Sequence, residues 1–186
     1  MRCMRTVWAA ALMVVVCAGA AFAAGGGGLT FGTQYWGLPD YASTYLGVTS
    51  IGGFGYGETH DGQRIGGFGI AFVPAMIDSP DYEGLVSGGI GGIVTGQAAR
   101  LGKLELALNL WLGVGGIATS TMRDDAGYMV GFAELNLELG LPLTRWMEIV
   151  GYIGYQAMGN FVPGPALGAF RYYTPVFGAR LVWGSF

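Results

Sequence analysis

The sequence has few residues that bind metals or carry out nucleophilic catalysis. Its only cysteines are Cys3 and Cys17, and its only histidine is His60. Both cysteines precede residue 24, in a segment that we expect to be cleaved off, so the mature chain has no disulfide and no thiol chemistry. Zinc sites are disfavoured because histidine and cysteine ligands are missing. We predict no catalytic residue, no cofactor and no metal site.

Charged residues are also scarce. They make up 11% of the chain, whereas a soluble globular domain averages about 25%. The 12 acidic residues outnumber the 9 basic ones, which argues against nucleic acid as a partner. No stretch after residue 23 stays apolar over ~20 residues, so a helical membrane protein is excluded.

Apolar residues, aromatic residues and glycine are abundant instead. The chain is 52% hydrophobic and 13% aromatic, and it contains 36 glycines. This composition excludes disorder, because disordered chains are poor in aromatic and β-branched residues. An apolar chain without a spanning helix indicates β structure, and among sheets only closed barrels satisfy every backbone group in lipid.

The first 23 residues have the features of a secretory signal peptide. Arg2 and Arg5 provide the basic start, residues 7–17 are apolar, and Ala21-Phe22-Ala23 matches the A-x-A cleavage pattern. The apolar run is too short for a transmembrane helix. We therefore predict two segments, a signal peptide at 1–23 and a single β-barrel domain at 24–186.

Strict alternation of apolar and polar side chains is clearest in residues 103–114 and 132–141. One face carries almost only leucine, and the other carries polar or small residues. A helix would spread these leucines around its axis, whereas a strand places them on one side. A strand of a soluble sandwich is the alternative, but its water-facing side would need more charge than this chain contains.

The remaining strands are predicted from weaker alternation and from turn residues. Six further strands are expected at 29–36, 43–57, 63–74, 84–97, 146–158 and 170–186. The connections are then 37–42, 58–62, 75–83, 98–102, 118–127, 142–145 and 159–169. From the third onward, long and short connections alternate, as do the extracellular loops and periplasmic turns of outer-membrane barrels. The pattern predicts an all-β, eight-stranded antiparallel up-and-down transmembrane barrel.

The chain ends at Phe186, and bacterial outer-membrane barrels commonly end in an aromatic residue at the close of the last strand. In strand count, loop alternation and terminal Phe, the sequence resembles the small eight-stranded barrels of the OmpA and OmpX type. The resemblance implies a bacterial outer-membrane location, contact with outer-membrane lipid, and recognition of Phe186 by the barrel-assembly machinery. An extracellular partner would meet the long loops.

A cluster of charged residues is predicted inside the barrel. Pairing consecutive strands through their turns places Glu138 near Glu148, and Glu148 near Arg180. Glu105 falls in about the same layer, and Arg64 is a further candidate. Carboxylates cannot all stay ionised in a narrow lumen without partners, so we expect a hydrogen-bonded cluster that plugs the barrel. The alternative is that these residues are separately solvated in a wet channel.

Other polar and aromatic residues carry weaker predictions. His60 is expected in a periplasmic turn, and the acidic residues of 75–83 and 118–127 are expected to be solvated rather than to bind a cation. We expect aromatic girdles at the membrane interfaces, formed by Trp36, Tyr41, Tyr45, Tyr56, Tyr128, Trp146, Tyr172, Tyr173 and Trp183.

Four functions follow from this sequence. The favoured one is a structural or surface-interaction barrel without enzymatic activity. The alternatives are a narrow, porin-like channel for small or apolar solutes, a lipid-modifying barrel enzyme, and a soluble lipocalin-like binder.

Overall fold

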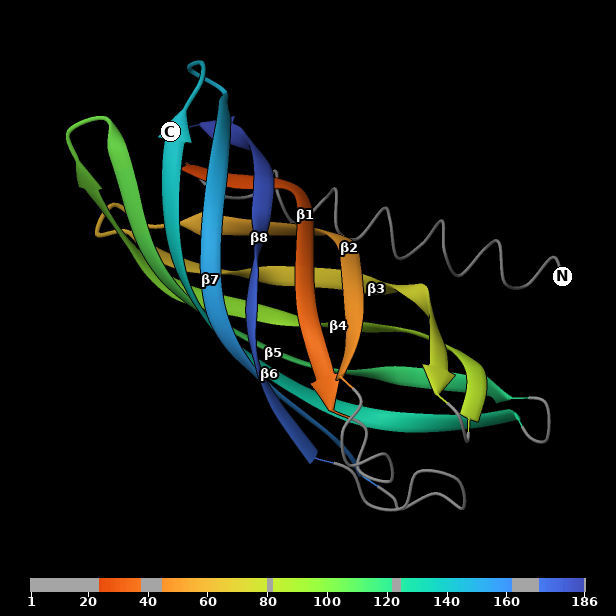
Figure 1. Ribbon diagram of the computed structural model, residues 1–186. Coiled ribbons are helices and arrows are strands. Elements are labelled where there is room, and N and C mark those ends of the chain that lie inside the picture. The colour runs from red at the N-terminus through yellow and green to blue at the C-terminus, as the bar shows by residue number, and fades with distance from the viewer. Residues whose placement is uncertain (1–23, 38–44, 80–81, 122–124, 162–170, 186) are drawn as a thin grey trace, which may run out of the picture.

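The computed structural model describes residues 24–37, 45–79, 82–121, 125–161 and 171–185. The predicted signal peptide and Phe186 lie outside these ranges. The described residues form eight antiparallel strands in one closed barrel (Figure 1), which confirms the predicted fold. The strands are β1 (Ala24–Gly37), β2 (Tyr45–Glu58), β3 (Gln63–Ser79), β4 (Tyr82–Leu101), β5 (Leu104–Thr121), β6 (Asp125–Pro142), β7 (Met147–Asn160) and β8 (Arg171–Ser185).

Every strand pairs with the next one along the chain, and β8 returns to pair with β1. Three short turns, at 59–62, 102–103 and 143–146, lie at the same end of the barrel as the start of β1 and the end of β8 (Figure 1). Gly62 and Gly102 have positive φ in the first two of these turns, where glycine avoids the strain that a Cβ would cause. Among the described residues, no helix is long and apolar enough to cross a membrane.

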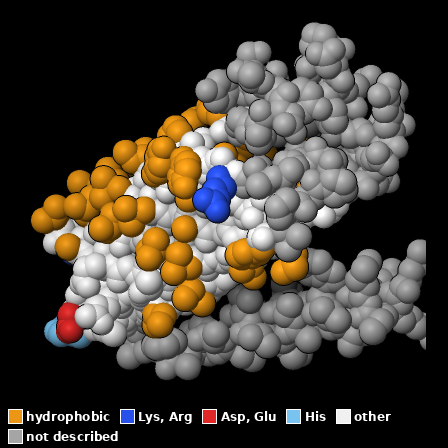
Figure 2. All heavy atoms as spheres, turned by 90° about the horizontal axis from the view of Figure 1, so that it is seen from below, with side chains coloured by type: hydrophobic (Ala, Val, Ile, Leu, Met, Phe, Trp, Pro, Cys, Tyr) orange, Lys and Arg blue, Asp and Glu red, His pale blue; other side chains and the backbone are white. Residues whose placement is uncertain are grey.

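The alternation in β5 and β6 determines which side chains enter the barrel. The leucines point outward and are exposed, as predicted: Leu104, Leu106, Leu108, Leu112, Leu135, Leu137, Leu139 and Leu141. Their neighbours of opposite parity are buried in the interior. The leucines make the outer wall apolar, and Figure 2 shows hydrophobic side chains spread over one face of it with few charged ones.

The four central strands are longer than predicted. β3, β4, β5 and β6 contain 17, 20, 18 and 18 residues, whereas about 9–11 residues cross a membrane. The predicted long loops at 75–83 and 118–127 are therefore wrong, because most of their residues belong to two hairpins. The backbone ladder continues although the hydrophobic alternation fades. The ladder shifts register between Phe72 and Ala75, and Pro74, which lacks an N–H donor, lies at that irregularity.

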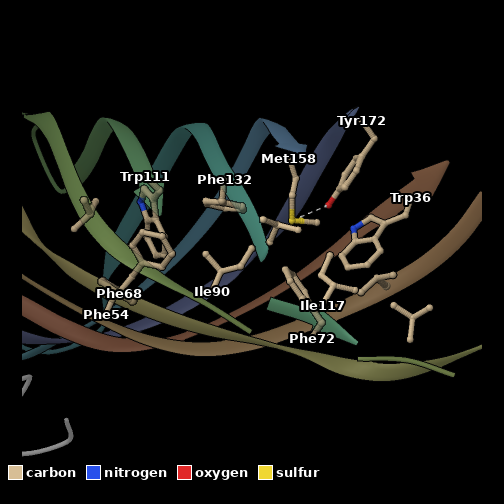
Figure 3. Packing of buried hydrophobic residues seen from close by; sticks show 14 of the residues in the cluster. Trp36, Phe54, Phe68, Phe72, Ile90, Trp111, Ile117, Phe132, Met158 and Tyr172 are labelled. Atoms are coloured by element: carbon tan, nitrogen blue, oxygen red, sulfur yellow. Dashed lines mark hydrogen bonds between the residues drawn. The ribbon is translucent and has the colours of Figure 1, made fainter. Parts of the chain in front are cut away.

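Aromatic side chains fill much of the barrel interior (Figure 3). The Trp111 ring lies 4.6 Å from Phe68 and 5.8 Å from Phe54 between centroids, and Trp36 lies 4.9 Å from Phe72. The predicted girdle is partly wrong for this reason, because four of its members are buried in the lumen: Trp36, Tyr56, Tyr128 and Tyr172. The position of a residue along its strand determines its height in the barrel. Whether its side chain points into the lumen or outward depends only on its place in the two-residue alternation of the strand.

Three other girdle members, Trp146, Tyr173 and Trp183, are exposed on the outside. The side chains of Tyr41 and Tyr45 lie outside the described part of the chain.

Inward-facing glycines make room for these large side chains. The Tyr152 ring lies along the inner wall over Gly178 of β8 and Gly32 of β1. Its hydroxyl lies 3.3 Å from the Phe31 carbonyl oxygen, to which it donates. A Cβ at Gly178 would lie 2.7 Å from Tyr152 Oη, and a Cβ at Gly32 would also collide with that hydroxyl. The high glycine content therefore has a packing reason, since an eight-stranded barrel has room inside only for side chains.

Candidate functional site: charge networks in the lumen

Arg180 of β8 is the centre of the first network, at mid-barrel. Its guanidinium donates to Glu138 of β6 and lies 3.3 Å from Thr30 Oγ1 through Nε. The guanidinium carbon is 4.3 Å from the Trp111 ring centroid and 4.1 Å from that of Tyr152. Arg180 is only 2% exposed. A buried arginine needs such partners, because desolvating an unpaired charge costs several kcal/mol.

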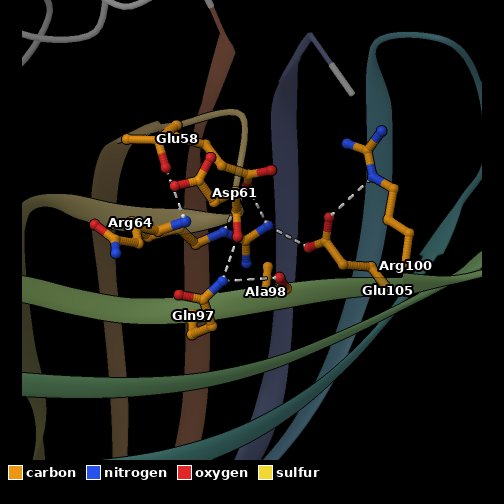
Figure 4. Close-up of polar contacts among 9 residues, drawn as sticks. Glu58, Asp61, Arg64, Gln97, Ala98, Arg100 and Glu105 are labelled. Atoms are coloured by element: carbon orange, nitrogen blue, oxygen red, sulfur yellow. Dashed lines mark hydrogen bonds and ion pairs between the residues drawn. The ribbon is translucent and has the colours of Figure 1, made fainter.

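Arg64 of β3 is the centre of the second network, close to the short turns (Figure 4). Its Nε donates to Glu58 at 2.7 Å, and a terminal nitrogen of its guanidinium group, Nη2, donates to Glu105 of β5. The guanidinium also lies 4.4 Å from the Tyr56 ring centroid. Arg100 Nε approaches the other oxygen of Glu105 at 3.7 Å. A chain of alternating charges thus runs along the wall of the barrel from β2 to β5 at this end.

The four residues of the predicted cluster are all buried on the inner face, but the structure distributes them differently. Arg180 contacts Glu138, and Glu105 contacts Arg64 instead. Glu148 lines a pocket with Glu105 near the second network. The structure therefore brings these residues together in two groups rather than in one layer.

The strand register explains the difference. Glu138 lies opposite Tyr152, and Glu148 lies opposite Pro142, so the predicted neighbours Glu138 and Glu148 lie four positions apart along the ladder. The 143–146 turn sets this register, because the backbone N–H groups of Leu143 and Thr144 both donate to the Met147 carbonyl oxygen. The sequence shows that a turn is present but does not show which residues close it.

Two further polar residues complete the mid-barrel network and were not singled out from the sequence. Asn136 Nδ2 donates to Glu134 at 2.7 Å, and both side chains are buried on the same face of β6 as Glu138. The signal for them was available, since Glu134, Asn136 and Glu138 alternate with leucines. Glu58 and Arg100 are not predicted as lumen residues because they fall in the predicted connections 58–62 and 98–102, whereas the structure places them in β2 and β4.

The described residues include no group of three or more His, Cys, Asp or Glu side chains arranged to hold a metal ion. The side chains of the acidic residues in 75–83 and in 118–127 are not among those described. His60 is exposed in the β2–β3 turn. The charged residues described above make their closest contacts with one another and with aromatic rings, an arrangement that fills and rigidifies the lumen.

The two arginines that contact Glu105 are expected to contribute unequally to stability. Replacing Arg100 by Gln should change the free energy of unfolding by less than about 1 kcal/mol, because its side chain is half exposed and its ion pair is long. Replacing Arg64 by Gln should cost about 3 kcal/mol or more, because two carboxylates then lose a buried partner. Urea unfolding of the barrel in lipid vesicles would measure both. Equal effects would show that burial of Arg64 is not important.

The fold is that of the small eight-stranded outer-membrane β-barrels. Among solved structures of this class, Neisserial surface protein A is similar to this chain, with a TM-score of 0.60 and 7% sequence identity over 87% of this chain and 96% of that one. Ail, the attachment invasion locus protein of Yersinia pestis, aligns with a TM-score of 0.43 and 11% identity over 86% of this chain and 97% of that one. No protein-family model matches, and the curated proteins give no significant match.

Proposed function

We propose that this protein is an integral outer-membrane barrel with a closed lumen and a structural or surface-interaction role. The observation that carries the proposal is the combination of an apolar outer wall with an interior filled by charge networks and aromatic rings. Trp111, at the centre of the barrel, is only 1% exposed and packs against Phe54, Phe68 and Arg180. A conducting pore would need a continuous wet path past these side chains.

The orientation follows from the lengths of the connections. The short turns at 59–62, 102–103 and 143–146 would face the periplasm, as in outer-membrane barrels generally. The β3–β4 and β5–β6 hairpins then extend outward from the opposite end, beyond the length that a bilayer requires. These two hairpins are the part of the described structure best placed to meet an extracellular partner.

Planar-bilayer recording is the direct test of the closed lumen. We expect the refolded mature chain to give no steady conductance, because the Arg180 network and the Trp111 cluster block the axis. Replacing Trp111, Phe68 and Phe54 together by Ala should open a path and produce conductance, which serves as the positive control for insertion. A sizeable steady conductance from the unmodified protein would support the alternative of a narrow channel and exclude a plugged lumen.

Two further measurements separate the remaining alternatives. A mature chain that stays monodisperse without detergent would support a soluble lipocalin-like binder and contradict membrane insertion. Mass spectrometry of membrane lipids with and without the protein tests for lipid-modifying activity. We expect no change in lipid composition, since His60 is exposed in a turn placed on the periplasmic side.

A further inference from the structure

A groove of about 1060 Å³ crosses the outer wall of the barrel. Its centre is formed by Gly151 of β7 and Ala179 of β8, which lie opposite each other in the ladder. Larger apolar side chains line it on both sides of this centre, among them Leu139, Ile153 and Phe177. The two central residues are small and their neighbours are large. This difference in side-chain size along the outer wall produces the groove.

The groove follows the hydrogen-bonding direction of the sheet from β5, where Leu104 and Leu106 line it, to β2, where Thr49 does. Neighbouring strands lie about 4.8 Å apart, so five steps span about 24 Å. With strands tilted by about 45°, the groove would rise about 17 Å along the membrane normal. That is close to half of the ~30 Å hydrocarbon layer, the depth that one leaflet occupies.

A second, polar pocket of about 410 Å³ adjoins the lower end of the groove, and Leu104 lines both. Arg100, Lys103 and Arg145, from the β4–β5 and β6–β7 turns, line this pocket. All three side chains are exposed, and Arg171 is the one other exposed basic residue in the described part of the chain. The exposed positive charge of the barrel is thus concentrated where the groove begins.

Two carboxylates, Glu105 and Glu148, also line the polar pocket. Both are buried, and Glu105 is contacted by Arg64 from inside the lumen and by Arg100 of the pocket at 3.7 Å. They therefore offset the three cations only in part. A basic pocket at headgroup level next to an apolar groove of one-leaflet length matches the two parts of a phospholipid.

We propose that this surface binds one anionic phospholipid of the periplasmic leaflet. An acyl chain lies in the groove across Gly151 and Ala179, and the headgroup phosphate contacts Arg100, Lys103 and Arg145. The proposal rests on the proposed membrane location. A second copy of this chain would be the other candidate for an apolar groove, but it would leave the basic pocket without a matching charge.

Filling the groove tests the acyl-chain part. A Cβ at Gly151 meets nothing within 4 Å, and the same is true at Gly69, an outward glycine of β3 outside the groove. Native mass spectrometry of the folded barrel, released from detergent in the presence of palmitoyl-oleoyl phosphatidylglycerol, would report the bound lipid. We expect one lipid per barrel, an affinity about tenfold lower for Gly151→Leu, and an unchanged affinity for the matched control Gly69→Leu. Ala179→Leu, read in the same way, provides a second filling variant.

Neutralising the basic pocket tests the headgroup part. The double variant Lys103→Gln/Arg145→Gln should weaken phosphatidylglycerol binding about tenfold, whereas Arg171→Gln should not. Diacylglycerol with the same chains should not be retained, and free glycerol phosphate should not compete. Equal binding by Gly151→Leu and Gly69→Leu, an unaffected Lys103/Arg145 variant, or a dimer abolished by Gly151→Leu would overturn the proposal.

Retention of the fold in each variant is checked by heat-modifiable migration on a gel. Failure of the lipid site can also be told apart from failure of the proposed function. A mature chain that is soluble without detergent would refute the membrane location, whereas a folded, detergent-requiring barrel that binds no phosphatidylglycerol would refute only the lipid site.

Discussion

Replacing Arg180 by Leu is expected to lower the free energy of unfolding by about 3–5 kcal/mol. The substitution removes one partner of a buried ion pair and leaves Glu138 charged in the lumen, and breaking a pair in this way is far more costly than removing both charges. Arg180 also contacts the rings of Trp111 and Tyr152, so cation–π stabilisation is lost as well. Urea titration of the barrel in lipid vesicles, followed by tryptophan fluorescence, gives the measurement.

Glu138, the other member of the ion pair, provides the control for this prediction. The double variant Arg180→Leu/Glu138→Leu should recover most of the lost stability, because no buried charge of the pair remains without a partner. Arg171→Leu, at an exposed position of the same strand, should have little effect. If the single and double variants were equally unstable, the loss would come from packing around Arg180 rather than from the ion pair.

Replacing Gly178 by Val is expected to destabilise the barrel by about 2–3 kcal/mol or to prevent folding. The added side chain would collide with the Tyr152 ring and with the Phe31 carbonyl oxygen of the neighbouring strand, and overpacking a dense interior forces side chains and backbone out of their preferred positions. Refolding yield and urea midpoint would both report the effect.

Gly151→Val is the matched control, because Gly151 lies on the adjacent strand but faces outward into open space. It should be neutral or slightly stabilising, since glycine weakens a strand interior. An equal loss in both variants would mean that glycine is required there by the backbone and not by the Tyr152 ring.

The sequence was most informative where alternation was strict. In residues 104–114 and 132–141, the predicted face of each side chain agrees with the structure, because a period of two leaves only two choices. Lys103, predicted on the polar face, is instead exposed in the β4–β5 turn. The barrel itself followed from the scarcity of charge together with that alternation. The inward positions of Glu105 and Glu138 also follow from this parity.

The sequence did not predict the register between neighbouring strands or how far the hairpins extend. The length of a turn predicts Glu138 next to Glu148, but the hydrogen bonds that close the turn at Met147 give a register in which Glu138 lies opposite Tyr152, four residues beyond Glu148. The sequence predicts loops at the ends of the two hairpins because side-chain alternation stops there, although backbone pairing continues. Glu105 and Glu138, the partners of Arg64 and Arg180, lie two strands away from these arginines, and no local pattern encodes such contacts.

The pairing of β1 with β8 has a consequence for how the protein is made. Gly25 lies opposite Ser185, so β1 finds its second partner only after β8, the last strand in the chain, is available. Until then the sheet has two open edges, which invite aggregation. The barrel therefore cannot close until β8 is in place, and up to that point nearly the whole chain has to be kept from aggregating.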